Sequence, residues 1–100
     1  MKANIVRNGV WIYGESVEKP VDIIGLEYDW YYEIDKIDGL LEEGEEPEPL
    51  GPEGLLYHVR FQEAGEEELG WIDGGCYQTI DDAMKEAESR ITGIIHWQHR

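Results

Sequence analysis

The sequence predicts an α+β domain: an antiparallel sheet of four to six strands with one C-terminal helix packed on a face. Several segments alternate apolar and polar residues, as strands do, whereas a single segment near the C-terminus has the spacing of an amphipathic helix. The chain has 100 residues, of which 41% are hydrophobic, enough for one core. We therefore expect a single domain over residues 1–100.

A first hairpin is predicted at residues 4–13. Asn8-Gly9 lies there between two β-prone runs, and this dipeptide tolerates the positive φ angles of a two-residue turn. A polar connection with Pro20 follows, and a long strand then begins near Val21 or Leu26. Gly25 would mark a bulge or bend in this strand.

The long strand ends near Asp35 and has the clearest alternation in the chain. Its apolar set, which we expect to be buried, is Leu26, Tyr28, Trp30, Tyr32 and Ile34. Its outward set is Glu27, Asp29, Tyr31, Glu33 and Asp35, a row of carboxylates with one tyrosine among them. A register slip of one residue would exchange the two faces.

A mobile acidic loop is predicted at about residues 37–54. The segment IDGLLEEGEEPEPLGPEG is rich in carboxylates, proline and glycine, which oppose regular structure. Leu40, Leu41 and Leu50 are its candidate apolar anchors. Two further strands are predicted in LLYHVRFQE, residues 55–63, and in LGWID, residues 69–73, with a turn between them.

The helix is predicted in TIDDAMKEAESRITG, which begins at Thr79. Thr79 is placed to cap the N-terminus, and acidic residues in the first turn suit the positive end of the helix dipole. One buried face is formed by Ile80, Ala83, Met84, Ala87 and Ile91. Gly93 would end the helix. Residues 94–98 then fit either a short last strand or a continuation of the helix to Trp97.

Charge is the strongest global feature: 23 Asp and Glu face 8 Lys and Arg, for a net charge of −15. Such a chain repels nucleic acid and anionic membranes, so we expect neither as a direct partner. Eleven of the acids lie from Glu27 to Glu53, with Lys36 as the one basic residue among them. We expect a basic partner, unless the acidity serves only solubility or a high-salt cytoplasm.

Patterns for catalysis, cofactors and metals are missing from the sequence. No glycine pattern for phosphate is present, and His96 and His99 have no third ligand of fixed geometry. Carboxylate pairs such as Asp29 and Glu33 are predicted in solvent among like charges, which assigns no acid or base role. The single Cys76 is expected to be a buried or inert thiol. We therefore expect no enzyme, no catalytic residue, no cofactor and no metal.

The localisation predicted from sequence is cytoplasmic. No run approaches the roughly 18 apolar residues of a membrane span. The N-terminus MKANIVRNGV lacks the apolar region of a signal peptide. A soluble protein is expected.

A resemblance adds a functional hypothesis. The small size, the acidity and the phrase GGCYQTIDDAMKEAE are similar to small acidic phage-encoded proteins, among them anti-CRISPR proteins. That group shares no motif, so no functional residue carries over from it. The resemblance implies DNA mimicry in the host-cell cytoplasm. Carboxylates would occupy the Lys- and Arg-lined surface by which a CRISPR effector complex binds DNA or reads its PAM.

The candidate partner-binding residues are Glu27, Asp29, Tyr31, Glu33, Asp35, Asp38, Glu42 and Glu43. Tyr31 would be a rigid anchor at the centre of the interface, or else a residue of ordinary cross-strand packing. Two alternative functions stay open. One is an immunity protein that neutralises a basic nuclease toxin by the same electrostatic logic. The other is an acidic accessory protein without a nucleic-acid-related target.

Overall fold

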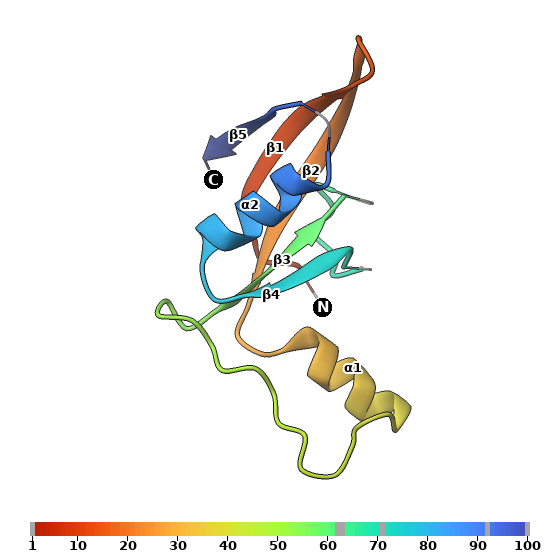
Figure 1. Cartoon of the computed structure of the whole chain (residues 1–100), viewed down its shortest axis with the longest axis vertical. Coiled ribbons are helices and arrows are strands. Elements are labelled where there is room, and N and C mark those ends of the chain that lie inside the picture. The colour runs from red at the N-terminus through yellow and green to blue at the C-terminus, as the bar shows by residue number, and fades with distance from the viewer. Residues whose placement is uncertain (1, 62–63, 71, 92, 100) are drawn as a thin grey trace.

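A computed structural model describes residues 2–61, 64–70, 72–91 and 93–99 of the chain. Within these residues five strands form one antiparallel sheet in the order β4-β3-β2-β1-β5, which confirms the α+β class. The strands are β1 (Ile5–Tyr13), β2 (Val17–Leu26), β3 (Leu56–Arg60), β4 (Gly74–Tyr77) and β5 (Ile95–His99); the helices are α1 (Trp30–Asp38) and α2 (Ile80–Ser89). Figure 1 shows α2 across the sheet and α1 beyond its lower end, in an elongated molecule of 48 × 27 × 24 Å.

The first hairpin turns at a different place from the one predicted. Asn8-Gly9 lies inside β1, and the chain reverses at residues 14–16, where Gly14 has a positive φ of 65°. Gly9 is needed for packing rather than for a turn. A Cβ on Gly9 would lie 2.8 Å from Cγ2 of Ile95 and 2.9 Å from the ring of Trp97, because these β5 side chains lean over its α-carbon.

The predicted long strand is in fact two elements. β2 begins earlier than predicted, at Val17, and ends at Leu26. Gly25 pairs regularly with β3, and the bulge in this part of the sheet lies in β1 instead. From Trp30 to Asp38 the chain forms α1, so the alternation of apolar and acidic residues does not continue as a strand.

Signals at both ends explain why α1 forms. Asp29 is the N-cap, and its carboxylate accepts a hydrogen bond of 3.1 Å from the Tyr32 amide. Gly39 adopts a left-handed φ of 72°, and its N–H donates to the last carbonyls of the helix. Trp30 and Ile34, which alternate as in a strand, are also four residues apart as on a helical face. The two caps favour the helical period.

Because residues 30–35 are helical, the predicted burial of the side chains in residues 26–35 is also partly wrong. Leu26 and Trp30 are buried as predicted, and Glu27 is exposed as predicted. The other members of both sets are half-buried: Tyr28, Asp29, Tyr31, Tyr32, Glu33, Ile34 and Asp35. Tyr31 does not point outward. Its ring lies 5.1 Å from the ring of Trp30 and 5.8 Å from the ring of His58, measured between centroids.

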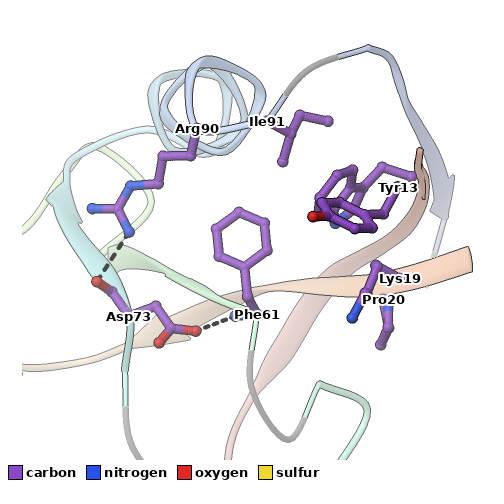
Figure 2. A pocket seen from close by; sticks show the side chains of 8 residues that line it. Tyr13, Lys19, Pro20, Phe61, Asp73, Arg90 and Ile91 are labelled. Atoms are coloured by element: carbon purple, nitrogen blue, oxygen red, sulfur yellow. Dashed lines mark hydrogen bonds between the residues drawn. The ribbon is translucent and has the colours of Figure 1, made fainter. Parts of the chain in front are cut away.

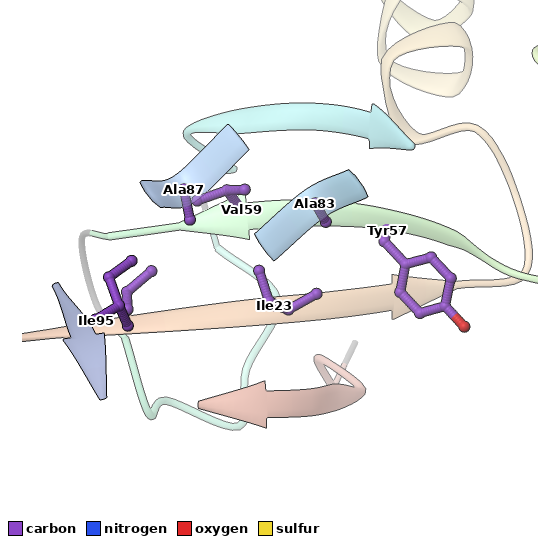
Figure 3. Close-up of a cluster of buried hydrophobic side chains, with 7 residues drawn as sticks. Ile23, Tyr57, Val59, Ala83, Ala87 and Ile95 are labelled. Atoms are coloured by element: carbon purple, nitrogen blue, oxygen red, sulfur yellow. The ribbon is translucent and has the colours of Figure 1, made fainter. Parts of the chain in front are cut away.

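The two faces of the sheet each carry an apolar cluster, because successive side chains of a strand point to opposite faces. Ile23 belongs to the cluster under α2, where Ala83 and Ala87 let the helix approach the sheet closely (Figure 3). Ile24, its neighbour, belongs to the cluster on the α1 side, with Trp30 of α1.

The C-terminal helix is confirmed. Thr79 caps α2 by accepting a hydrogen bond of 3.2 Å from the Asp82 amide, and the predicted apolar face packs inward. α2 ends at Ser89, before Gly93, and residues 95–99 form β5, so the strand alternative for this segment is right.

The predictions for β3 and for its neighbour at the edge of the sheet, β4, differ in accuracy. β3 lies inside the predicted residues 55–63, of which Gln62 and Glu63 are outside the described residues. The strand predicted at residues 69–73 is wrong: the strand that pairs with β3 is β4, which begins after this segment. Trp71 lies outside the described residues.

Candidate interaction surface

Most of the charge lies at one end of the molecule, which we call the acidic lobe and define as residues 27–53, α1 and the loop after it. Figure 1 shows the lobe at the opposite end from the tip of the β1–β2 hairpin. It contains eleven of the 23 acidic residues and one lysine, so it carries a net charge of −10 out of −15. The charge is therefore segregated in space as well as in sequence.

The loop of the lobe has no helix or strand over residues 40–55. It begins later than the predicted residue 37, because Ile37 and Asp38 belong to α1, and it is tied to the fold. The Glu48 amide donates a hydrogen bond of 2.8 Å to Asp29 Oδ2. The Gln78 side chain donates one of 3.0 Å to the Pro49 carbonyl. A Cβ on Gly51 would overlap the Gln78 carbonyl, so the loop passes directly against this residue. The mobility of the loop stays a prediction.

The eight predicted partner-binding residues all lie in the segment that we define as the lobe, but they do not share one face of a strand, because residues 30–38 form α1. The exposed ones are Glu27, Asp38, Glu42 and Glu43, and the half-buried acids on α1 are Glu33 and Asp35. Asp29 and Tyr31 are turned to internal contacts, the N-cap and the packing on His58. Sequence reasoning left out the exposed Glu45, Glu46, Glu48 and Glu53, although the run EEGEEPE signals them.

Behind the lobe lie two titratable side chains, His58 and Cys76. His58 is fully buried, and neither of its ring nitrogens is hydrogen bonded among the described residues. Burial lowers the pKa of His58, with the Gly75 backbone and the Asp29 carboxylate acting in the opposite direction. Burial, followed by the nearby carboxylates of Asp29 and Glu48, raises the pKa of Cys76 to about 12. Such a thiol carries almost no thiolate at neutral pH and is a poor nucleophile.

A buried ion pair that sequence reasoning missed lies on the α1 side of the sheet. Arg60 Nη2 is 3.0 Å from Asp22 Oδ2, and both side chains are almost fully buried. Arg60 also donates to the carbonyls of Glu66 and Glu68, at 2.6 and 3.1 Å, so it fastens the turn after β3 to the sheet. The signal in the sequence was a charged residue inside an apolar strand run, since only paired charges are tolerated there.

On the α2 side, a cleft of about 540 Å³ lies between the helix and the hairpin. Its lining residues are Trp11, Tyr13, Lys19, Pro20, Phe61, Asp73, Arg90 and Ile91 (Figure 2). Its charged groups are already engaged. Asp73 accepts a hydrogen bond from the Phe61 amide, and Arg90 donates to the Asp73 carbonyl at 3.0 Å. The Lys19 ammonium lies 5.6 Å from the centre of the Tyr13 ring.

A second hollow, which we call the apolar groove, lies between the acidic lobe and the segment before β4. It has a volume of about 420 Å³ and is lined by Tyr28, Trp30, Glu33, Ile34, Ile37 and Leu69. Trp30 is 8% exposed, whereas Ile37 is 78% exposed. The most acidic part of the chain thus borders an apolar hollow, and Ile37 in its lining is largely open to solvent.

Three further findings bear on the site. The described residues contain no group of three or more His, Cys, Asp or Glu side chains that could hold a metal ion. No helix in the described part of the chain combines the length and apolarity needed to cross a membrane. No family model, no curated protein and no solved structure matches the chain.

Proposed function

We propose that this protein is a non-enzymatic inhibitor that binds the basic, DNA-contacting surface of another protein through its acidic lobe. The segregation of charge is the observation that carries the proposal. A net charge of −10 lies at one end of a molecule 48 Å long. That end can enter a basic groove while the sheet and α2 stay outside it.

The charge density of the lobe is close to that of a nucleic acid strand. Residues 42–48 contain five glutamates. Because an extended chain spans at most about 3.6 Å per residue, these five charges lie within about 22 Å, roughly one per 5 Å. A DNA strand carries one charge per about 3.4 Å. Arg and Lys side chains that bind phosphates also bind carboxylates, through the same charge-assisted hydrogen bonds.

The resemblance to anti-CRISPR proteins makes the DNA-binding or PAM-reading surface of a CRISPR effector complex the proposed target, in the host-cell cytoplasm. Such complexes hold nucleic acid in a positively charged channel and read the PAM with arginine side chains. A polyanion bound there excludes the target duplex. No cofactor or metal is needed for inhibition of this kind.

The experiment is a competition between this protein and target DNA for a purified CRISPR effector complex. We expect the protein to displace labelled duplex DNA, and its own affinity to fall by about tenfold or more between 50 and 200 mM salt, because the contacts are ionic. A ternary complex in which protein and DNA bind together at full affinity would contradict occlusion of the DNA site.

A further inference from the structure

We propose that the apolar groove of the acidic lobe binds one large apolar side chain of the partner, presented from a segment with Lys or Arg on both sides. This inference rests on the proposed function and gives it a specific anchor. The partner is a basic protein segment with a single apolar residue at its centre.

The shape of the groove fits such an anchor. Its floor is the nearly buried Trp30, and Ile34 lies one helical turn further along α1. Ile37, on the next turn, and Leu69, from the segment before β4, complete the lining. Tight interfaces commonly centre on one side chain that fills a desolvated pocket with polar groups around it. Tyr31 was predicted for this role from the sequence, but it is used inside the fold.

The exposure of Ile37 indicates that no other described residue covers this side of the groove. Ile37 is 78% exposed although it lines the hollow beside residues that are buried or half-buried. Large aliphatic side chains that stand alone on a surface are common. An exposed one at the edge of an apolar hollow is more typical of an interaction site.

The charges around the groove select the chemistry of the partner. Among the described lining residues Glu33 alone is charged, and its carboxylate, after burial, helps to raise the pKa of the Tyr28 phenol. Asp38 follows Ile37 on α1, and the exposed Glu66, Glu67 and Glu68 precede Leu69. An acidic or anionic occupant is repelled by this surround, whereas Lys and Arg beside the apolar residue match it.

Two synthetic peptides test the inference. Each has ten alternating Lys and Arg residues, five on either side of a central Leu in one peptide and a central Ser in the other. We expect the Leu peptide to bind the protein about tenfold more tightly by isothermal titration calorimetry, since the anchored side chain adds apolar burial to the same charge. Amide chemical shifts in the NMR spectrum should change around Ile34 and Ile37 with the Leu peptide.

Two variants that each replace one exposed isoleucine test whether the groove is the binding site for the Leu side chain. Ile37→Ser should remove the preference for Leu without unfolding the protein, because the side chain is largely exposed. Ile94→Ser is the control: Ile94 is 72% exposed and lies before β5, outside the lobe, so this variant should keep the full preference.

The outcomes separate the two proposals. If neither peptide binds in a salt-dependent manner, the proposed function fails. If both peptides bind equally and Ile37→Ser changes nothing, the lobe binds basic segments but the groove inference is wrong. A dimer detected by sedimentation and lost in Ile37→Ser would place a second copy of the chain in the groove, which also overturns the inference.

Discussion

At the scale of single residues, Asp29 shows how one side chain can decide the path of the chain. The sequence pattern indicates one more charge in an outward row. In the structure its carboxylate accepts the amide of Tyr32 and the amide of Glu48, at 3.1 and 2.8 Å. The same residue therefore starts α1 and holds the acidic loop against it.

Replacing Asp29 should cost stability through this cap. We expect Asp29→Ala to lower the free energy of unfolding by about 1 kcal/mol, the typical value for loss of an N-cap. Asp29→Asn should retain most of it, because asparagine caps as well as aspartate. Asp38→Ala, at the C-terminal end of α1, is the control and should cost nothing, since a negative charge there opposes the helix dipole. Urea unfolding measures all three, and equal losses from Asp29→Ala and Asp38→Ala would contradict the capping role.

His58 should make stability depend on pH. Burial holds the pKa of His58 below its usual value of 6.5. Just below pH 6.5 the imidazole is therefore protonated to a greater extent in the unfolded chain than in the folded chain. Stability contributed by neutral His58 is thus complete above pH 6.5 and falls as the pH drops from there towards the folded pKa. One proton gives a slope of up to about 1.4 kcal/mol per pH unit. Denaturant unfolding between pH 7.5 and 5.5 should show this slope in the native protein but not in His58→Leu. Identical slopes would count against it.

At the scale of elements, the sequence predicts the type of element correctly where the apolar residues fit only one periodicity, that of a helix or that of a strand. α2 has only helical spacing, and its Thr79 cap and inner face are both found. The segment from Trp30 to Ile34 fits both periods, and β-prone aromatic residues favoured the wrong one. Asp29 before this segment and Gly39 after it are helix-capping signals that are visible in the sequence, and they favour the helix that the structure contains.

Other elements depend on contacts that no local pattern contains. Asn8-Gly9 has the composition of a turn, but Gly9 serves the approach of β5, whose residues lie at the far end of the chain. Asp22 and Arg60 are 38 residues apart in sequence, and their pairing follows from the register of β2 and β3. The position of the acidic lobe was likewise unpredictable from local pattern, since it follows from α1 leaving the sheet.

The packing of β5 against β1 depends on Gly9. We expect Gly9→Ala to destabilise the protein by about 1 to 3 kcal/mol, because the added Cβ would press on Ile95 and Trp97 and force them to shift. Gly14→Asn, at the observed turn, should cost less, because a Cβ there meets nothing within 4 Å and asparagine tolerates a positive φ. Thermal unfolding of both variants decides this. A tolerated Gly9→Ala would show that β5 does not pack as described.

At the scale of the whole molecule, most of the net negative charge lies in the acidic lobe, at one end of the fold. Two carboxylates about 6 Å apart in water repel by roughly 0.7 kcal/mol, and physiological salt screens this over about 8 Å. The described residues of the loop after α1 belong to neither core cluster, so the repulsion among the carboxylates of this loop acts outside the core. A basic partner would reduce the electrostatic repulsion among these carboxylates. This contribution to binding would be larger at the lobe than on the rest of the surface, where the acidic residues are less concentrated.

Binding through the acidic lobe is tested by comparing two variants of equal net charge. One neutralises four exposed acids of the lobe, with Asp38→Asn, Glu42→Gln, Glu43→Gln and Glu46→Gln. The other neutralises four exposed acids elsewhere, with Glu15→Gln, Glu18→Gln, Asp81→Asn and Glu88→Gln. Each is titrated against the same CRISPR effector complex with target DNA as competitor. We predict that the lobe variant loses about 2 kcal/mol or more of binding free energy and the other variant less than about 0.5 kcal/mol. Equal losses would mean that only net charge matters, and would contradict a binding surface in the acidic lobe.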